Sequence, residues 1–514
     1  MDLYAQTSSV VSKHASVSSD QPAATQIGID ILKRGGNAAD AAVATMAAVS
    51  IIQPMMCGIG GDCHCIFYRK KDKKVMTLNG SGRTGKNATL DKVRAAGITD
   101  PEECFNHGLW VSVPGTIAGM VKVVEEFGSG KLTMKDIFSP AIRLAEKGVP
   151  TPLKNAITWE KSQHKFRHSK NANDLLIDDK APTPGDIIYA PKLAKVLRNV
   201  ADFGLEAFYS GTTAQNIASA VQEAGGVLTA EDLKEHLFNP PNPHTGEALG
   251  LGHNSPDYIH LVAETIKHAY LGAWEYLCDP KCCSESVEAI LTEEFAQNLR
   301  NKIDSESDTS YVAAVDEEGN GCSFICSLYS NFGTGIIPDD CGFALQDRAT
   351  TMSLEEGSKN VFGPNKLPLH TIIPAIVTET ASNDLLSVVG VVGGWMQPQG
   401  HVQVLLNMIV FGMDPQVALN QPRFFVGDPD PPSVGYLGSL QNLCLEGEID
   451  LSAAPFLERK GHICRFISGW GRHMLGRGHV IARSKLFDPN SAEGSSNCWW
   501  SGADPRCDGC AMGY

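Results

Sequence analysis

The sequence predicts an α+β protein in which antiparallel strand pairs alternate with blocks of helix. A strand at 309–316, a polar turn and a second strand at 322–329 give a hairpin signal. An alanine-rich run at 41–50 indicates a closely packed helix, and an apolar strand at 385–392 leads through two glycines to a helix at 399–410. No short internal repeat divides the chain, and a layered fold of this size can form one unit.

Composition and charge narrow the possible function classes. The 514 residues are 43% hydrophobic and 20% charged, an ordinary globular composition. The net charge of −15 argues against a general nucleic-acid binder, because such proteins need clustered Lys and Arg. No stretch reaches the roughly 18 apolar residues of a membrane span, and the N-terminus lacks the basic and apolar regions of a secretory signal. We therefore expect a cytoplasmic protein with neither nucleic-acid nor membrane partners.

The 15 cysteines lie scattered through apolar segments. Without an export signal, buried reduced thiols are the default. Two pairs, Cys63 with Cys65 and Cys507 with Cys510, invite a metal interpretation, but neither has a second half at zinc-site spacing. Alternating cysteines in a strand place both sulfurs on one face. We predict structural cysteines, and neither a metal nor an organic cofactor.

The N-terminal segment is expected to start with a loose, serine-rich tail of about 20 residues. A helix at 23–33 then stops at the glycines of 35–36, a common C-terminal signal. Polar residues in 37–40 open the helix at 41–50.

Further elements follow from apolar periodicity and turn residues. The glycine cluster at 58–61 precedes two strands, 65–68 and 75–78, joined by a lysine-rich turn. Because the cluster lacks the Lys-Ser/Thr of a phosphate loop and leads into a strand, a tight turn is the better interpretation. The segment 114–233 is expected to be mostly helical, and another helix is expected at 257–277.

Thr309 is the candidate nucleophile. By itself, a threonine in a strand is an ordinary β-branched residue. If the chain is cut between Asp308 and Thr309, however, the new N-terminal residue carries both a hydroxyl and a base, its own amine, whose pKa of about 7.7 suits proton transfer. The hydroxyl can attack the preceding carbonyl, and water then opens the ester. Gly393 and Gly394, at the start of a helix, offer N–H donors for the oxyanion, although an isolated Gly-Gly is more often a close-packed turn.

A series of motifs in fixed order resembles the γ-glutamyltranspeptidase family. It begins with GGNAADAAVA at 35–44 and ends with the DPR-containing segment at 504–514, so that it spans nearly the whole chain. Many ordered motifs are more specific than any one of them. The others lie at 58–61, 113–119, 139–145, 264–270, 279–280, 332–335, 363–366, 393–394, 414–415 and 422–423.

The resemblance implies an N-terminal-nucleophile hydrolase with an αββα four-layer sandwich, which matures by cutting itself before Thr309. Residues 1–308 would then form the large subunit and 309–514 the small catalytic subunit, a heterodimer of two fragments folded as one unit. Ser327 falls where the family has a threonine hydroxyl that touches the nucleophile. The glycines of 393–394 match the family's oxyanion-hole pair.

The expected substrate pocket departs from the family pattern. Family members hold the γ-glutamyl α-carboxylate and α-amino group with an Arg and an Asp, plus an Asn and a pair of Ser. Here the Arg position falls near Ser81, and Arg83 could serve only if the loop shifts. The Asn position is Tyr329, and the Ser pair is replaced by His370 and Thr371. We predict that Arg83, Tyr329, His370 and Thr371 bind the substrate.

The position of the family's Asp also changes. It falls at Thr350 or Thr351, close to Asp347 and Arg348. Together with Trp395, the substituted residues would give a broader, partly apolar pocket; ordinary packing beside a site is the alternative. The pattern resembles a divergent, acylase-like branch of the family.

Three functions are therefore open. The leading hypothesis is a hydrolase or transferase of γ-glutamyl amides, with glutathione the first substrate to test. An acylase for other N-acyl amides is the nearer alternative, and a catalytically silent homologue with a binding or structural role is the other. Between Leu237 and His253 the family carries a strand and a loop that this chain lacks. The apparently missing block favours the silent homologue, whereas Thr309 and the glycine pair favour the enzyme.

Overall fold

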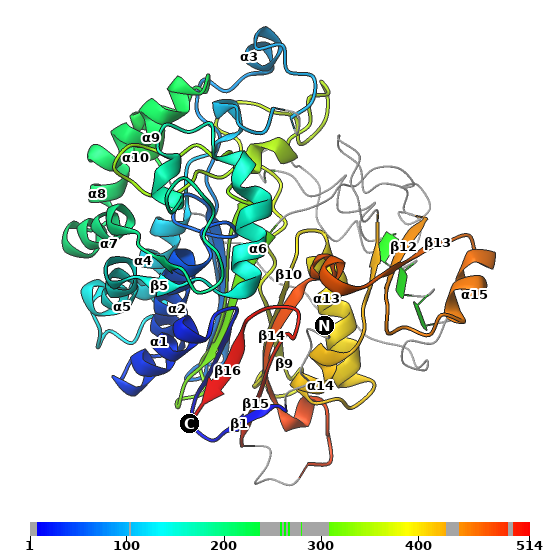
Figure 1. Cartoon of the computed structure of the whole chain (residues 1–514). Coiled ribbons are helices and arrows are strands. Elements are labelled where there is room, and N and C mark those ends of the chain that lie inside the picture. Colours follow the sequence, from blue (N-terminus) through cyan, green and yellow to red (C-terminus); the bar gives the residue numbers. More distant parts are fainter. Residues whose placement is uncertain are drawn as a thin grey trace.

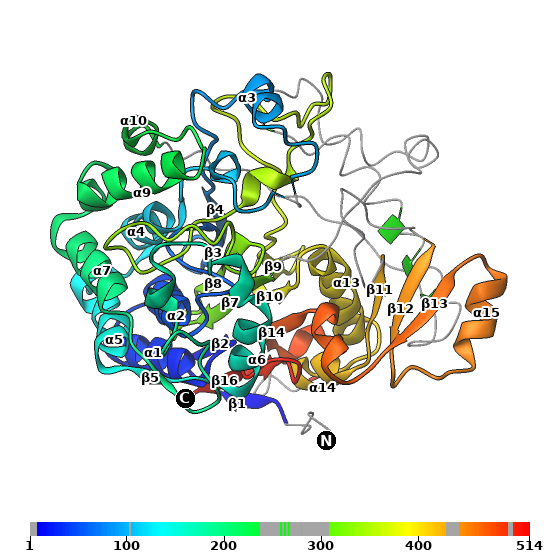
Figure 2. The same cartoon turned by 45° about the horizontal axis from the view of Figure 1, so that its top comes forward.

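Two antiparallel sheets stack face to face, and helices cover both of their outer faces (Figures 1 and 2). The computed structural model describes residues 8–101, 104–236, 308–427, 441–491 and 497–514, together with 258, 259, 262, 263, 266, 267 and 279. This arrangement confirms the predicted α+β class and the αββα sandwich.

The six-stranded sheet holds the predicted hairpin, β7 and β8, at its centre. Along β7, Tyr311 and Ala313 point into the core between the sheets, whereas Val312 and Ala314 point towards the helices. This alternation buries both faces of the strand. The strand order is β16-β2-β7-β8-β3-β4, with bounds Cys510–Gly513, Ser16–Ser19, Asp308–Val315, Gly321–Tyr329, Asp62–Arg69 and Lys74–Gly80.

The five-stranded sheet contains β10, which matches the predicted strand at 385–392. Val388 faces the other sheet and Val389 faces the outer helices. Between the sheets, a Cβ on Gly390 would lie 2.5 Å from the ring of Tyr311, so only glycine fits there. The order is β1-β15-β14-β10-β9, with bounds Val10–Ser12, Trp499–Ala503, Arg477–Arg483, Leu385–Val392 and Ala375–Thr378.

Helices from the N-terminal half cover the six-stranded sheet (Figure 1). At their centre α2 is buried along its whole length, which its alanines allow, and Asn37 with Asp40 forms the capping box that starts it. The helices described in this half are α1 Pro22–Lys33, α2 Ala38–Ile52, α3 Leu90–Ala95, α4 Thr116–Phe127, α5 Met134–Lys147, α6 Leu153–Ser162, α7 Pro191–Phe203, α8 Glu206–Tyr209, α9 Thr212–Glu223 and α10 Ala230–Lys234, of which α3 lies away from the sheet at the top of Figure 1. A short strand pair, β5 Val149–Pro150 and β6 Ile187–Ile188, lies among them.

The outer face of the five-stranded sheet is covered by α13 and α14 (Figure 2). Beyond them lies a small sheet in which β12 pairs with β11 antiparallel and with β13 parallel. The bounds are α13 Met396–Ile409, α14 Pro415–Asn420, β11 Phe424–Val426, β12 Asn442–Glu446, β13 Ile463–Ile467 and α15 Ala453–Arg459. None of the helices within the described part of the chain is long and apolar enough to span a bilayer.

The N-terminal segment corrects one prediction. Instead of a loose tail, residues 10–12 and 16–19 form strands of both sheets, and β2 lies between β16 and β7. Serine is compatible with this buried position because its hydroxyl can bond across the sheets: Ser16 Oγ lies 2.7 Å from Ser501 Oγ, and Ser18 Oγ lies 2.9 Å from His479 Nδ1. The prediction of a loose tail from polar composition alone was therefore wrong.

Other predicted elements agree within a few residues. The helix expected from 41 begins at Ala38, and the helix expected from 399 begins at Met396. Cys63 and Cys65 both lie on the helix-facing side of β3, as the alternation predicted. Most of the helix expected at 257–277, and the place of the missing block at 237–253, lie outside the described residues.

Candidate active site

Thr309 lies at an irregularity of the β7–β8 pair. Asp308 is paired with Tyr329 and Ser310 with Cys326, so Thr309 faces two residues of β8, Ser327 and Leu328, in a β-bulge. Such a bulge bends the strand that carries the extra residue, here β8. Thr309 is fully buried at the start of β7, and its own carbonyl oxygen accepts a hydrogen bond of 3.0 Å from Arg477 Nη2 on β14 of the other sheet.

Two side chains contact the Thr309 hydroxyl. Its Oγ1 donates a hydrogen bond to Ser327 Oγ over 3.2 Å, and Gln397 Nε2 donates to the same Oγ1 over 3.4 Å. Ser327 Oγ also accepts a 2.9 Å bond from the backbone N–H of Tyr329, which fixes the position of its oxygen. Gln397 is fixed as well, since its Oε1 accepts from the N–H of Ile373 over 2.8 Å. The hydroxyl thus sits in a defined polar environment inside the sandwich.

Gly393 and Gly394 connect the end of β10 to α13. Their φ angles are +123° and +53°, a region that L residues with side chains rarely adopt. The carbonyl of Gly394 accepts from the N–H of Gln397 over 3.0 Å, so the glycine pair is one helical turn from a side chain that touches Thr309. Gln397 thus contacts both Gly394 and the Thr309 hydroxyl, whereas an oxyanion-binding role for the glycine pair stays a prediction.

Four ionisable side chains form a second group beside Ser327. Asp62 pairs with Ser327 across β3 and β8, and its Oδ1 accepts 3.0 Å bonds from Gly82 N and Gln346 Nε2. Its Oδ2 lies 3.6 Å from His370 Nε2. Burial raises the pKa of Asp62 to about 7, even though the nearby positive charge of Arg348 opposes that effect.

The two histidines of this group are neutral at pH 7. Burial, reinforced by the charge of Arg348, lowers the pKa of His64 to about 4 and that of His370 well below its usual value. The contact between His370 and Asp62 is therefore not an ion pair near neutral pH. The rings of His64 and His370 lie 5.0 Å apart, and His64 Nε2 is 2.8 Å from Ser81 Oγ.

The structure separates the residues predicted to bind substrate into two sets. Tyr329, His370 and Thr371 gather around Arg348, whose Nη1 donates to Thr371 Oγ1 over 2.9 Å and whose guanidinium lies 4.8 Å from the centre of the Tyr329 ring. Arg83 is not among them. Its Nη1 is 2.5 Å from Asp279 Oδ2 and 3.1 Å from the carbonyl oxygen of Asn365, two partners that occupy its cationic end.

Sequence reasoning missed Gln397, Asp62 and the central place of Arg348. Gln397 follows Gly394 by three residues, so its position one helical turn along the predicted strand-glycine-helix unit was a usable signal. Asp62 directly follows the glycine cluster at 58–61. The approach of Arg477 to Thr309 had no local signal, because it depends on how the two sheets stack.

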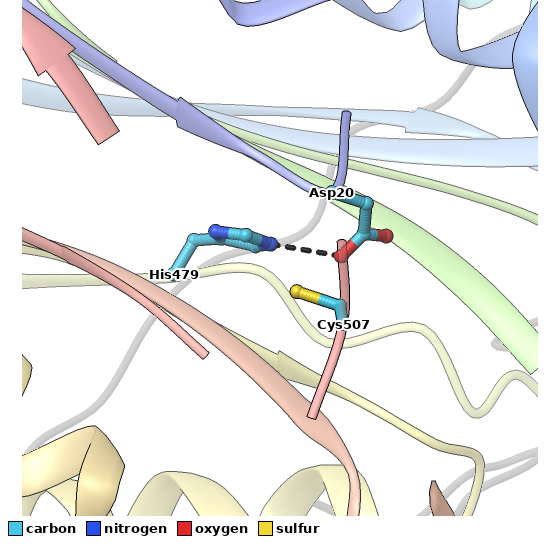
Figure 3. Close-up of side chains that lie close together, drawn as sticks. All are labelled: Asp20, His479 and Cys507. Carbon is cyan, nitrogen blue, oxygen red and sulfur yellow. Dashed lines mark hydrogen bonds and ion pairs between the residues drawn. The ribbon is translucent and has the colours of Figure 1, made fainter. Parts of the chain in front are cut away.

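A separate buried cluster involves one of the suspected metal ligands. The ligand atoms of Asp20, His479 and Cys507 lie within 4.8 Å of one another (Figure 3). Both ring nitrogens of His479 are engaged, Nδ1 with Ser18 Oγ and Nε2 with Asp20 Oδ1 at 2.8 Å. Burial raises the pKa of the Cys507 thiol, which donates to the carbonyl oxygen of Asp504 over 3.1 Å. We interpret the cluster as a hydrogen-bonded link between the two sheets.

Comparison with known proteins identifies the family. The sequence profile described as gamma-glutamyltranspeptidase matches residues 24–248 and 244–514. The chain belongs to the γ-glutamyltranspeptidase family. The two matches meet close to the place where the sequence indicated a missing block.

Several relatives of the family match over the full length of the chain. The glutathione hydrolase-like YwrD proenzyme of Bacillus subtilis is 30% identical over 545 aligned positions, covering 98% of this chain and 99% of the relative. Because this chain has only 514 residues, that relative carries residues that this chain lacks. The oxamate amidohydrolase proenzyme of Klebsiella pneumoniae is 27% identical, with 99% and 100% covered. Cephalosporin acylase from Bacillus halodurans has a TM-score of 0.82 and 29% identity, with 99% and 97% covered.

Family motifs away from Thr309 form a buried charge network. Arg423 Nη2 lies 2.6 Å from Asp504 Oδ2, and Arg506 bridges Asp504 and Glu446. Arg472 Nε lies 2.5 Å from the same Glu446. The motifs at 422–423 and 504–514 of this γ-glutamyltranspeptidase family member therefore meet in a structural ion network that joins the small sheet to the end of β15.

Proposed function

We propose that this protein is an amide hydrolase with an N-terminal threonine nucleophile, Thr309, that opens γ-glutamyl or related acyl amides. The observation that carries the proposal is the contact of Thr309 Oγ1 with Ser327 Oγ and Gln397 Nε2, one helical turn from Gly393 and Gly394. The names of full-length relatives, which include a glutathione hydrolase-like proenzyme and an oxamate amidohydrolase proenzyme, support amide hydrolysis as the reaction class.

Maturation would use the same hydroxyl as catalysis. Thr309 Oγ attacks the carbonyl of Asp308, the peptide C–N bond breaks, and the acyl group moves to oxygen as an ester. Water then hydrolyses that ester, which leaves a carboxylate on Asp308 and a free amine on Thr309. The products are fragments 1–308 and 309–514, which we infer stay together as one folded enzyme.

In turnover, the free amine of Thr309 takes the hydroxyl proton as Oγ attacks the substrate amide carbonyl. The backbone N–H groups of Gly393 and Gly394 are proposed to stabilise the oxyanion, and the protonated amine gives its proton to the leaving amine. Water, or an amino acid in the transfer reaction, then removes the acyl group from Oγ. Each step uses only the residues of this chain and the substrate.

An acylase for other N-acyl amides is a second candidate for the same chemistry. It is favoured by the substitutions in the pocket, where Tyr329, His370 and Thr371 stand at positions that carry an Asn and two Ser elsewhere in the family. The similarity to a cephalosporin acylase over nearly the whole of both chains supports it further.

We also infer a reducing, cytoplasmic compartment. Twelve cysteines within the described part of the chain are free thiols. Seven of them, the first at residue 57 and the last at residue 444, are buried in the hydrophobic core. Disulfides would be the usual state of such a set in an oxidising compartment.

The deciding experiment follows the purified full-length protein with time on a denaturing gel. We expect the 55.1 kDa chain to give two fragments, with Thr at the N-terminus of the smaller one, and to gain activity on γ-glutamyl or simple acyl anilides. Thr309→Ala should remain one band without activity, and Thr309→Ser should keep part of both. Equal activity of wild type and Thr309→Ala would overturn the mechanism. A persistent, inactive single band of wild type would instead support the silent homologue.

A further inference from the structure

Arg348 is a buried cation whose hydrogen bonds are incomplete. Its side chain is fully buried, yet its Nε and Nη2 atoms have no hydrogen-bond partner within the described part of the chain. One nitrogen alone, Nη1, donates to Thr371 Oγ1. Burying a guanidinium without saturating its donors is costly, because the desolvated N–H groups gain nothing in return. An arginine in this state is a candidate for an anion-binding group.

The neighbours of Arg348 do not neutralise it by direct contact. The Tyr329 ring covers it at 4.8 Å, and the carboxylates of Asp62 and Asp347 act on it only through space. Asp347 is engaged elsewhere, because it accepts from the N–H and the hydroxyl of Ser330. Asp62 is only partly ionised near neutral pH, since burial raises its pKa to about 7. Neither carboxylate is hydrogen bonded to the guanidinium, so its Nε and Nη2 donors remain available to a ligand.

Arg348 also lies next to the proposed nucleophile site. The preceding residue, Asp347, donates its N–H to the carbonyl of Leu328 over 3.3 Å. Leu328 stands between Ser327, which contacts Thr309, and Tyr329, which stacks on the guanidinium. Tyr329 is partly exposed and His370 has 12% of its side chain exposed, so the group around Arg348 is not wholly closed to solvent.

We propose that Arg348 binds a carboxylate on the acyl part of the substrate and so selects amides whose acyl group carries that charge. The inference rests on the proposed amide hydrolase. A carboxylate would give Nε and Nη2 the acceptors they lack, in the two-pronged geometry that suits a guanidinium. Rotation of the Tyr329 ring would admit the ligand.

Arg83 is the alternative residue for binding the substrate carboxylate. Its Nη1 is already engaged by Asp279 and by the carbonyl of Asn365, so its charge is balanced by a direct ion pair. Arg348 makes no direct ion pair within the described part of the chain, and two of its buried nitrogens lack a hydrogen bond. Substitution of Arg348 should therefore reduce the preference for a carboxylate substrate, whereas substitution of Arg83 should not.

The test uses the mature enzyme and 4-nitroanilides whose acyl chains end in a carboxylate, each paired with its methyl ester. The measured quantity is the ratio of kcat/KM for the charged substrate to that for its ester. We expect wild type to prefer the carboxylate, and Arg348→Gln to reduce this ratio by about 10- to 100-fold, the size of a hydrogen-bonded charge interaction. Arg348→Lys should keep part of the preference, and Arg83→Gln should keep it whole.

A second measurement needs no variant at Arg348. Succinate should inhibit wild type competitively, and succinamide should not. Equal rates on the acid and ester substrates, failure of succinate to inhibit, or loss of the preference in Arg83→Gln but not in Arg348→Gln would each overturn the assignment. Those results would leave the proposed hydrolase standing if hydrolysis still required Thr309, whereas loss of that requirement would remove both.

Discussion

The hydroxyl groups of Thr309 and Ser327 are hydrogen bonded to each other across the β7–β8 pair, at the point where a bulge interrupts its register. Ser327 is the acceptor in this bond, and the N–H of Tyr329 donates to the same oxygen. The arrangement leaves the Thr309 oxygen able to accept from Gln397, so its hydroxyl is held from two sides.

Replacing Ser327 should slow the enzyme more than it destabilises it. Ser327→Ala removes the acceptor of the Thr309 hydroxyl, and we expect both fragment formation and kcat/KM to fall by about 10- to 100-fold. Ser327→Thr should restore much of the rate because it returns a hydroxyl. Ser323→Ala is the matched control on the same strand, where the hydroxyl bonds Tyr311 and Ala375 instead. A comparable loss of rate in that control would contradict an orienting role for Ser327.

Gln397 gives a second test of the same geometry. Gln397→Glu keeps an acceptor for the N–H of Ile373 but loses the donor to Thr309 Oγ1. We expect kcat/KM of the folded enzyme to drop by at least about tenfold; the urea midpoint should fall as well, because the new carboxylate is buried. Gln399→Glu, two residues along α13, alters an amide that bonds Val426 and Trp395. It should reduce stability and spare the rate of the enzyme that remains folded. The reverse pattern would show that Gln397 only supports the fold.

The raised pKa of Asp62 predicts a pH dependence of stability. Because this carboxyl titrates at about 7 in the folded protein and at about 3.8 in its ordinary state, the folded chain holds a proton that the unfolded chain has lost between those values. The contribution of this group to the free energy of unfolding is therefore fully present below about pH 4 and is lost as the pH rises to about 7.

Asp62→Asn should abolish this slope and raise the free energy of unfolding at pH 8 by on the order of 1–4 kcal/mol. Urea titrations of both proteins at pH 5 and pH 8 measure the difference. If the variant retained the wild-type change between these pH values, another group would be responsible.

The buried ion network should contribute strongly to stability. Asp504→Asn leaves Arg423 and Arg506 without a shared carboxylate, and we expect a loss of about 3–5 kcal/mol in the free energy of unfolding at pH 7. Asp72→Asn, which removes an exposed partner of Arg69, should change stability little.

The same carboxylate predicts an acid limit. Although burial alone would raise it, the charges of Arg423 and Arg506 hold the pKa of Asp504 at about 2. Its stabilisation is thus complete above about pH 4 and is lost as the pH falls towards 2. Wild type should lose stability over that window, and Asp504→Asn should show a shallower decline in chemical denaturation.

The sequence was most informative where local pattern decides structure. Two strand-forming runs joined by a polar turn placed the hairpin within one residue of its start at Asp308, and the run 385–392 gave β10 with both ends correct. The capping residue Asn37 located the start of α2 within a few residues. The order of family motifs then supplied the sandwich.

It was least informative where distant segments meet. The serines of β2 are buried because they form hydrogen bonds with residues of β14 and β15, and no residue close to them in sequence predicts these contacts. Arg348 was noticed as a nearby residue, but its unsatisfied donors appear only when Tyr329 and Thr371 are packed against it.

The strand order β16-β2-β7-β8-β3-β4 has a consequence for the two fragments that the proposed cleavage would produce. Strands that precede residue 81 and strands that follow residue 307 are interleaved in this sheet: β2 lies between β16 and β7, and β3 pairs with β8. Thus β2, β3 and β4 come from one side of the Asp308–Thr309 bond and β16, β7 and β8 from the other. Because their strands are interleaved in one sheet, the two polypeptides cannot dissociate without unfolding. Because unfolding of the processed protein would release two chains, its melting temperature should fall on dilution, whereas that of the uncut Thr309→Ala chain should not.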